Sequence, residues 1–407
     1  MIYSKTPLGL SYAIMQSPGK AAYCALSVKC GTRAEADTPE GTAHFVEHCL
    51  FKGTESRSAE SINSRLDRLG GELNAYTTKE EIVLHATVLK EDIRKAIDLL
   101  LEIGTQATFP EDEMEIEKGV VIDEIISYKD SPADDIVDRF EAMFFEGHPL
   151  GRLTLGTEDS VKSITRKDLV KYYRENFTPD SMVLSIVADD KESRIERMVQ
   201  DICAKYCTAG SRTIRQSQPK PRHNCFNIRE EKGNHEANYI IGAIAPSLYD
   251  GKRRMSAILL SNILGGPAGN SLLNTELREK HGWAYAADCS YTQYSDAGLI
   301  SIGVGCDAEN LDKCLHHTYR ILRRLKDTPL SETRLKAAKK QLFGQLAISA
   351  DSHENQCLSM GKSGLAFGRI IPDKESIDEI NALTAYDLQS LAGELWQDGN
   401  YSQLIFV

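Results

Sequence analysis

Short segments of this chain alternate between apolar and polar residues, and longer segments repeat apolar positions every three to four residues. Alternation over four to eight residues is typical of a half-buried strand, and the longer period is typical of an amphipathic helix. The predicted strands are residues 23–28, 72–77, 82–89, 237–245 and 299–304. The predicted helices are residues 309–326, residues 332–349 and residues 58–69, the last stopped by glycines at 70 and 71.

The order of these elements roughly repeats along the chain. Residues 109–125 resemble residues 329–346 in the way the helix begins and in its apolar period. Residues 208–224 are polar, contain two prolines and lack a sustained apolar period, which is typical of a linker. We therefore predict an α+β protein with two homologous α/β-sandwich-like domains, each a mixed sheet packed by helices. The predicted divisions are residues 1–210, a linker at 211–224 and residues 225–407.

Composition narrows the possible functions. The chain has 407 residues, of which 41% are hydrophobic and 26% charged, as in an ordinary globular protein. Its net charge of −11 argues against nucleic acid or an anionic membrane as a partner. No apolar run reaches the ~20 residues of a membrane helix, and the first residues lack a leader pattern, so we expect a cytoplasmic location. The ten cysteines form no C-x-x-C pair and are expected to be reduced.

The run from Gly41 to Gly53 has the apolar period of a buried helix and contains a His-x-x-Glu-His motif, formed by His44, Glu47 and His48. Residues four apart on a helix lie about 40° from one another, so both imidazoles can reach one ion. The alternative is that the two histidines only satisfy hydrogen bonds in the core. Two imidazoles and a carboxylate suit zinc, and a catalytic zinc has three protein ligands and a water. Glu47 is better placed to take the proton of that water than to bind the ion.

The third ligand must come from elsewhere in the domain, and the acidic helix predicted after Pro110 offers candidates. Its opening residues, 111–113, favour the helix N-terminus and need no other role. Glu117 and Glu124 are seven residues apart and share a helix face to within about 20°. Carboxylates so close to a buried face need a partner, and a metal site would supply one.

Several segments together resemble the inverted-motif zinc peptidases, the family of pitrilysin, insulin-degrading enzyme and mitochondrial processing peptidase, and especially its shorter bacterial members. The resemblance covers nearly the whole chain. The segments that carry it are residues 41–48, 51–54, 73–77, 117–124, 148–152 and 155–157.

This resemblance implies that Glu124 is the third zinc ligand and that Glu117 supports the site from behind. Asp123 is the competing ligand, but its side chain turns about 100° away on a helix. In the second half, the repeat places Ala338 and Gln345 opposite these glutamates, and that half has no His-x-x-Glu-His motif. One zinc ion per chain is therefore expected.

The resemblance also assigns residues for substrate binding. Arg278 and Tyr285 of the second half are implied to reach the active site, Tyr285 stabilising the oxyanion and Arg278 orienting the peptide backbone. The preceding loop, residues 265–270, is richer in Gly and Pro than usual for the family, so the loop that positions Arg278 can differ. A peptide is expected to add as a strand to the edge formed by Leu73, Asn74, Ala75 and Tyr76. The alternative for this segment is a plain structural strand.

The expected function is that of a zinc metalloendopeptidase that hydrolyses peptides or unfolded segments bound in extended form inside a clamshell chamber. Family members of this length resemble half of the clamshell of their double-length relatives, which implies a homodimer or, alternatively, a heteromer with a zinc-less partner. The competing function is a non-catalytic scaffold or partner subunit of a peptidase assembly. A further alternative is a metal hydrolase that acts on bonds other than peptide bonds.

Overall fold

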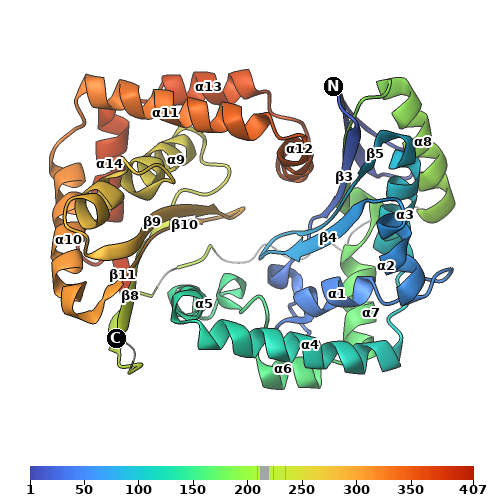
Figure 1. The fold of residues 1–407 in the computed structure, drawn as a ribbon, viewed down its shortest axis with the longest axis horizontal. Helices are drawn as coiled ribbons and strands as arrows, with labels where there is room; N and C mark the ends of the chain where they lie inside the picture. The colour runs from blue at the N-terminus through green and yellow to red at the C-terminus, as the bar shows by residue number, and fades with distance from the viewer. Residues whose placement is uncertain (209, 211–219, 223, 234) are drawn as a thin grey trace. The chain divides into compact units, whose positions relative to one another are not determined.

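Strand pairing divides the chain into two sheets, each in its own unit (Figure 1). The computed structural model describes residues 1–208, 210, 220–222, 224–233 and 235–407. Unit 1 comprises Met1–Ile126, Arg152–Ser217 and Ile348–Ile371, and unit 2 comprises Ser127–Gly151, Gln218–Ala347 and Pro372–Val407.

The sheet of unit 1 has six strands in the order β1-β2-β6-β3-β5-β4. Its pairs are antiparallel except β2 with β6, which run parallel. The strands are β1 (Ile2–Lys5), β2 (Ser11–Gln16), β3 (Ala21–Val28), β4 (Glu72–Thr77), β5 (Ile82–Leu89) and β6 (Met182–Ala188). The helices of this unit are α1 (Thr42–Leu50), α2 (Ala59–Asp67), α3 (Ile93–Gln106), α4 (Glu111–Asp130), α6 (Glu158–Ser163), α7 (Arg166–Asn176), α8 (Glu192–Tyr206) and α12 (His353–Phe367).

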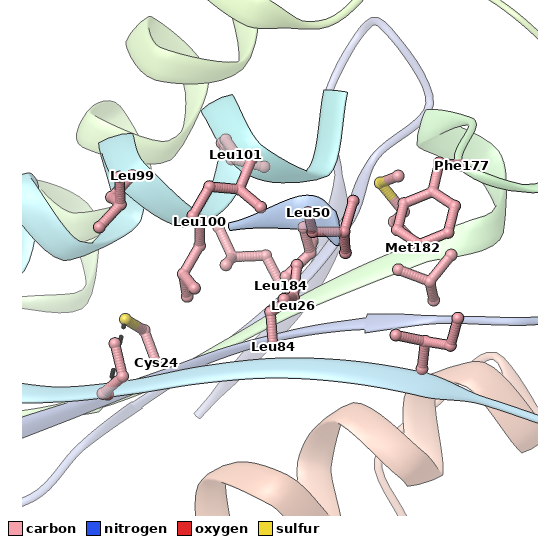
Figure 2. Close-up of a cluster of buried hydrophobic side chains, with 14 of the residues drawn as sticks. Cys24, Leu26, Leu50, Leu84, Leu99, Leu100, Leu101, Phe177, Met182 and Leu184 are labelled. Atoms are coloured by element: carbon pink, nitrogen blue, oxygen red, sulfur yellow. Dashed lines mark hydrogen bonds between the residues drawn. The ribbon is translucent and has the colours of Figure 1, made fainter. Parts of the chain in front are cut away.

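Leucines from α3 and from the central strands form the main core of unit 1. Figure 2 shows Leu100 and Leu101 of α3 on the side of the sheet that carries Leu26, Leu84 and Leu184. All five side chains are fully buried. Burying a leucine stabilises a fold by about 1.5–3 kcal/mol, so this cluster is a large part of what holds α3 and the sheet together.

Helix α12 covers the opposite face of the same sheet, over β3 and β6. Alternate residues of β3 serve the two faces: Leu26 belongs to the core beneath α3, and Ala25 packs with Cys357 and Met360 of α12. Strand β6 is buried at every residue for the same reason. Cover on both faces explains why β6 is apolar at nearly every position.

Unit 2 has a five-stranded sheet in the order β7-β11-β8-β10-β9. Only β7 and β11 run parallel. The strands are β7 (Asn227–Glu230), β8 (Glu236–Ala245), β9 (Ala284–Gln293), β10 (Gly298–Asp307) and β11 (Tyr401–Phe406). The helices are α5 (Pro132–Phe144), α9 (Gly251–Gly265), the π-helix η5 (Asn274–Glu279), α10 (Leu311–Asp327), α11 (Glu332–Ala350), α13 (Asp373–Asn381) and α14 (Ala385–Leu395).

The two units repeat one topology, which confirms the predicted duplication. Strands β2-β6-β3-β5-β4 of unit 1 correspond in order and direction to β7-β11-β8-β10-β9 of unit 2. Helices α9, α10 and α11 stand where α1, α3 and α4 stand in the first unit. The predicted α+β class with two homologous domains is therefore confirmed. The strands and helices predicted from periodicity are all present, with ends shifted by a few residues.

One exchange departs from the contiguous division that the sequence predicted. Helix α5 lies in the first half of the chain but packs on β8 and β11 of unit 2, where Ile136, Phe140 and Phe144 form a cluster with Ile240 and Phe406. Helix α12 does the reverse and covers the sheet of unit 1. The predicted boundaries at residues 210 and 225 miss both helices. Most of the predicted linker, residues 211–224, lies outside the described residues.

Candidate metal centre

Helix α1 carries the His-x-x-Glu-His motif, and its first turn is fixed by close contacts. It begins after Gly41, whose φ of 85° is left-handed and whose missing Cβ would lie 2.6 Å from the carbonyl oxygen of Leu155. The buried carboxyl group of Glu35 accepts a hydrogen bond from the backbone N–H of Ala43 at 2.8 Å. A carboxyl oxygen at a helix N-terminus satisfies a backbone N–H group that has no partner within the helix, so Glu35 helps to fix where α1 begins.

His44, His48 and Glu124 bring three ligand atoms together. Oε2 of Glu124, on α4, lies 3.7 Å from Nε2 of His44 and 3.6 Å from Nε2 of His48. These distances are too long for hydrogen bonds. Ligand atoms about 2.0–2.2 Å from a tetrahedral zinc lie roughly 3.3–3.6 Å from one another, so the three atoms fit one ion. Asp123, the competing ligand, is exposed on the same helix.

The surroundings of His48 also fit a metal ligand. Its Nδ1 is 2.9 Å from Oε1 of Glu117, and the other oxygen of this carboxylate is 2.5 Å from Nζ of Lys52. A carboxylate on the far nitrogen of a histidine fixes its tautomer and leaves Nε2 free for an ion. Burial alone would raise the pKa of Glu117, but its hydrogen bonds with His48 and Lys52 lower it, so the carboxylate stays charged.

His44 is held by packing. It is 7% exposed, its ring stands edge-on to that of His48 with centroids 4.5 Å apart, and its Nδ1 has no hydrogen-bond partner among the described residues. Burial and the neighbouring His48 lower the pKa of His44 to about 4. The imidazole is therefore neutral at pH 7, which is the form that binds a metal.

Glu47 faces the same site from α1 and is not among the three converging ligands. Its Oε2 accepts a hydrogen bond of 2.8 Å from the hydroxyl of Thr77, the last residue of β4. Burial raises the pKa of Glu47, and the Thr77 hydrogen bond opposes that shift. A carboxylate fixed through one oxygen keeps the other available for a proton, which is what a general base requires.

The predicted substrate strand is an edge strand, as its proposed role requires. Leu73, Asn74, Ala75 and Tyr76 lie on β4, which pairs with β5 on one side and has no strand on the other among the described residues. The backbone groups on that side can pair with an added strand. Thr77 connects this edge directly to Glu47.

Arg278 and Tyr285 belong to unit 2. Arg278 lies on η5 with an exposed side chain, and Tyr285 is 50% exposed on the edge strand β9. The register of β9 on β10 shifts at Tyr285, which forms a bulge, and the Tyr285 hydroxyl donates to Glu236 at 3.1 Å. Its ring occupies space that a Cβ on Gly305 would fill. A bulge changes the direction of a side chain, and here it turns the Tyr285 ring over Gly305 of the neighbouring strand β10.

A pair of amides lies in unit 2 at the place that the predicted repeat sets opposite Glu124. There Gln345 of α11 accepts a 2.6 Å hydrogen bond from Asn262 of α9. The two neutral side chains satisfy each other, as expected for a repeat that binds no metal.

A second cluster of possible ligands also lies in unit 2, formed by Glu276, His281 and His317. Its carboxylate already pairs with Lys280 at 3.0 Å, with His317 at 2.9 Å and with Arg320. Burial opposes the charged form, but the hydrogen bonds from Lys280 and His317 and the charge of Arg320 lower the pKa of Glu276 to about 2. Two cations on one carboxylate repel a third, so the cluster is satisfied as an ion-pair network.

The sequence prediction gave no role to three residues of the site: Glu35, Lys52 and Thr77. Lys52 and Thr77 stand inside segments that carry the family resemblance, which is the signal that was available for them. Glu35 had no such signal, because its contact with α1 joins a loop to a helix start.

No helix in the described part of the chain is long and apolar enough to cross a membrane.

Both halves of the chain match known protein families. A family described as "Insulinase (Peptidase family M16)" matches residues 12–158, and one described as "Peptidase M16 inactive domain" matches residues 163–342. "Uncharacterized zinc protease YmxG" of Bacillus subtilis is 32% identical over 377 residues, which cover 92% of this chain and 90% of that protein. An uncharacterized zinc protease of Mycobacterium leprae is 29% identical and covers 96% of this chain and 88% of its own length.

Solved structures share the fold. A protease from Helicobacter pylori superposes with a TM-score of 0.91 at 20% identity and covers 100% of this chain and 98% of its own. A peptidase M16 inactive domain from Pseudomonas fluorescens superposes with a TM-score of 0.90 at 18% identity and covers 100% and 97%. Identities this low extend the likeness to the fold alone.

Proposed function

Because the chain belongs to peptidase family M16, we propose that it is a zinc metalloendopeptidase that cleaves peptides or unfolded segments bound in extended form. The observation that carries the proposal is the convergence of His44, His48 and Glu124 beside Glu47. Zinc is supported by the names of the relatives and by this donor set. When bound, zinc would supply Lewis acidity that lowers the pKa of a water and polarises the scissile carbonyl.

The chain's own residues account for the proton transfers. Glu47 removes a proton from the attacking water as the water oxygen bonds to the carbonyl carbon, and then delivers that proton to the leaving nitrogen. Thr77 holds Oε2 of Glu47, so the proton resides on Oε1. A positioned general base typically contributes 10²–10⁴-fold to the rate. Glu117 and Lys52 keep the His48 ring oriented.

Substrate binding is assigned to two edges of the fold. The free edge of β4 would take the peptide as an added strand through backbone hydrogen bonds, a mode that selects extended chains over particular sequences. We assign Tyr285 to the developing oxyanion and Arg278 to the peptide backbone, as the family resemblance implies. The bulge and Gly305 support the Tyr285 assignment, since they hold the ring in place over Gly305. To stabilise the oxyanion, the Tyr285 hydroxyl would turn its single proton from Glu236 to the substrate.

Metal content and peptide cleavage, measured together for the native chain and Glu47→Gln, test this function. The expected result is one zinc per chain in both proteins and cleavage of a mixed peptide library by the native chain alone. Cleavage of small esters or amides without cleavage of peptides would instead indicate another metal hydrolase. A native chain that holds no metal and cleaves nothing after zinc is supplied would favour the scaffold alternative.

The proposed assembly is a homodimer that encloses the substrate. Sedimentation of the purified chain tests it. A species of twice the chain mass supports the homodimer, and a monomer at micromolar concentration contradicts it.

A further inference from the structure

The sheet of unit 2 leaves part of its open face uncovered, and a pocket of about 160 Å³ lies there between α5 and strands β8, β9 and β10. Helix α5 covers β8 and β11 with Ile136, Phe140 and Phe144. The floor beyond the helix is formed by small residues of β9 and β10, including Gly303 and Gly305. Drug-sized ligands occupy pockets of about 300–1,000 Å³, so this volume suits a single side chain.

One carboxylate in this pocket has no counter-charge. Asp288 of β9 makes no hydrogen bond or ion pair with any described residue, and the described lining includes no lysine, arginine or histidine. Gly303 makes room for this carboxylate, because a Cβ there would lie 3.0 Å from Oδ1 of Asp288. The Asp288 side chain is exposed at the pocket, and the desolvation that it still experiences raises its pKa with no cation to oppose the shift.

The rest of the lining suits an alkyl chain. Ile136, Phe140 and Leu299 form an apolar wall, and Val137 of α5 is 47% exposed at the same place. Lysine and arginine side chains lay their methylene groups along apolar surface and present their charge at the end. An apolar wall that leads to one unpaired carboxylate is complementary to such a side chain.

We propose that this pocket binds a lysine or arginine side chain of the peptide substrate, with Asp288 as its counter-ion. The inference rests on the proposed peptidase function and adds a preference for basic residues to it. Gly305, which makes room for the Tyr285 ring, also lines the pocket, so the subsite adjoins a residue already assigned to substrate binding. The net charge of −11 favours the approach of basic peptides.

Equilibrium binding to the Glu47→Gln chain tests the subsite without turnover. Fluorescence anisotropy would give Kd values for labelled peptides that carry one lysine, scanned along the sequence, and for the same peptides with N-acetyl-lysine. At the position that occupies the pocket, lysine should bind about tenfold more tightly, because the acetyl group removes the charge and keeps the stem. Adding Asp288→Asn should bring that ratio close to one and leave Kd for the acetylated peptide within about twofold.

Two further variants make the result specific. Asp327→Asn makes the same charge change at an exposed position of the same unit and should keep the lysine preference. Ala286→Lys leaves Asp288 in place but supplies an internal cation from the pocket lining, and should remove the preference.

A preference that persists in Asp288→Asn, or a parent chain that binds both peptides equally, overturns the subsite. Equal weakening of both peptides by Asp288→Asn also overturns it, because the residue then acts through the fold. If the parent chain binds no peptide at all, the subsite fails together with the proposed function. If it binds peptides without a lysine preference, the subsite alone fails.

Discussion

At the scale of single residues, the centre depends on pairs of side chains that are distant in sequence. Glu117 meets His48 across 69 positions, and Thr77 meets Glu47 across 30. Each pair fixes one atom of a group that would act on the metal or on the substrate. Removing the supporting partner should therefore weaken one step and leave the fold intact.

Glu117→Gln should lower zinc affinity by about 10–100-fold, because His48 loses its charged acceptor and Lys52 its counter-ion. Competition with a chelating indicator measures the Kd. Asp123→Asn is the matched control on the same helix, where the side chain is exposed, and it should leave the Kd unchanged. If Asp123→Asn weakens zinc binding more than Glu117→Gln does, the ligand on α4 is Asp123 and not Glu124.

Thr77→Val keeps the shape of the side chain and removes the hydrogen bond to Glu47. A hydrogen bond to a charged group is worth about 1.5–3 kcal/mol, so we expect kcat to fall roughly ten- to a hundredfold with zinc content unchanged. Thr77→Ser should restore most of the rate. A fall in zinc content that parallels kcat would show that Thr77 supports the metal site and not the base.

At the scale of elements, the first turn of α1 and the packing of α12 on its sheet each depend on close contacts. Glu35 is buried beneath the first turn of α1. Burial raises its pKa to about 8, although the Ala43 N–H and the charge of Arg152 oppose the shift. In an unfolded chain a glutamate titrates near about 4.3.

Between these two values the folded state binds more protons than the unfolded state, so the contribution of Glu35 to stability falls as the pH rises from about 5 to 8. Glu35→Gln stays neutral and can still accept from Ala43. Thermal midpoints of the metal-free proteins at pH 5.5 and 7.5 should therefore differ less in the variant than in the native chain. An equal difference in both proteins contradicts this role.

Helix α12 approaches its sheet through glycine. A Cβ on Gly361 would lie 2.4 Å from Oγ of Ser27 on β3, whereas a Cβ on Gly344 of α11 meets nothing within 4 Å. Gly361→Ala should destabilise the protein by about 1–3 kcal/mol through overpacking. Gly344→Ala, the matched control, should stabilise it by up to about 1 kcal/mol through helix propensity. Denaturant midpoints measure both, and equal changes would show that α12 is not closely docked.

At the scale of the whole molecule, we expect the duplicated topology to hold one metal ion. The second unit has the Asn262–Gln345 contact at the corresponding place, and its Glu276 carboxylate pairs with Lys280 and Arg320. One zinc per chain should therefore bind, and it should raise the thermal midpoint because only the folded state binds it tightly.

The His44→Ala variant tests that stoichiometry. It should lose both the zinc and the thermal shift, while His317→Ala should keep both. Metal analysis with calorimetry before and after chelation distinguishes them. A second equivalent of zinc that disappears in His317→Ala would show that the Glu276 cluster is a metal site after all.

The sequence by itself determined the elements, the α+β duplication and, together with the family resemblance, the residues that converge at the centre. Local periods account for the elements and for His44 and His48, which share a helix face four residues apart. The choice of Glu124 on the later helix rested on the resemblance. Tertiary structure alone decided which sheet α5 and α12 cover, that Thr77 and Lys52 support the centre, and that Asp288 stands in a pocket without a counter-charge. These contacts join segments that are far apart in the sequence, where no periodic pattern relates one residue to the other. Only the packing of the complete chain could bring them together.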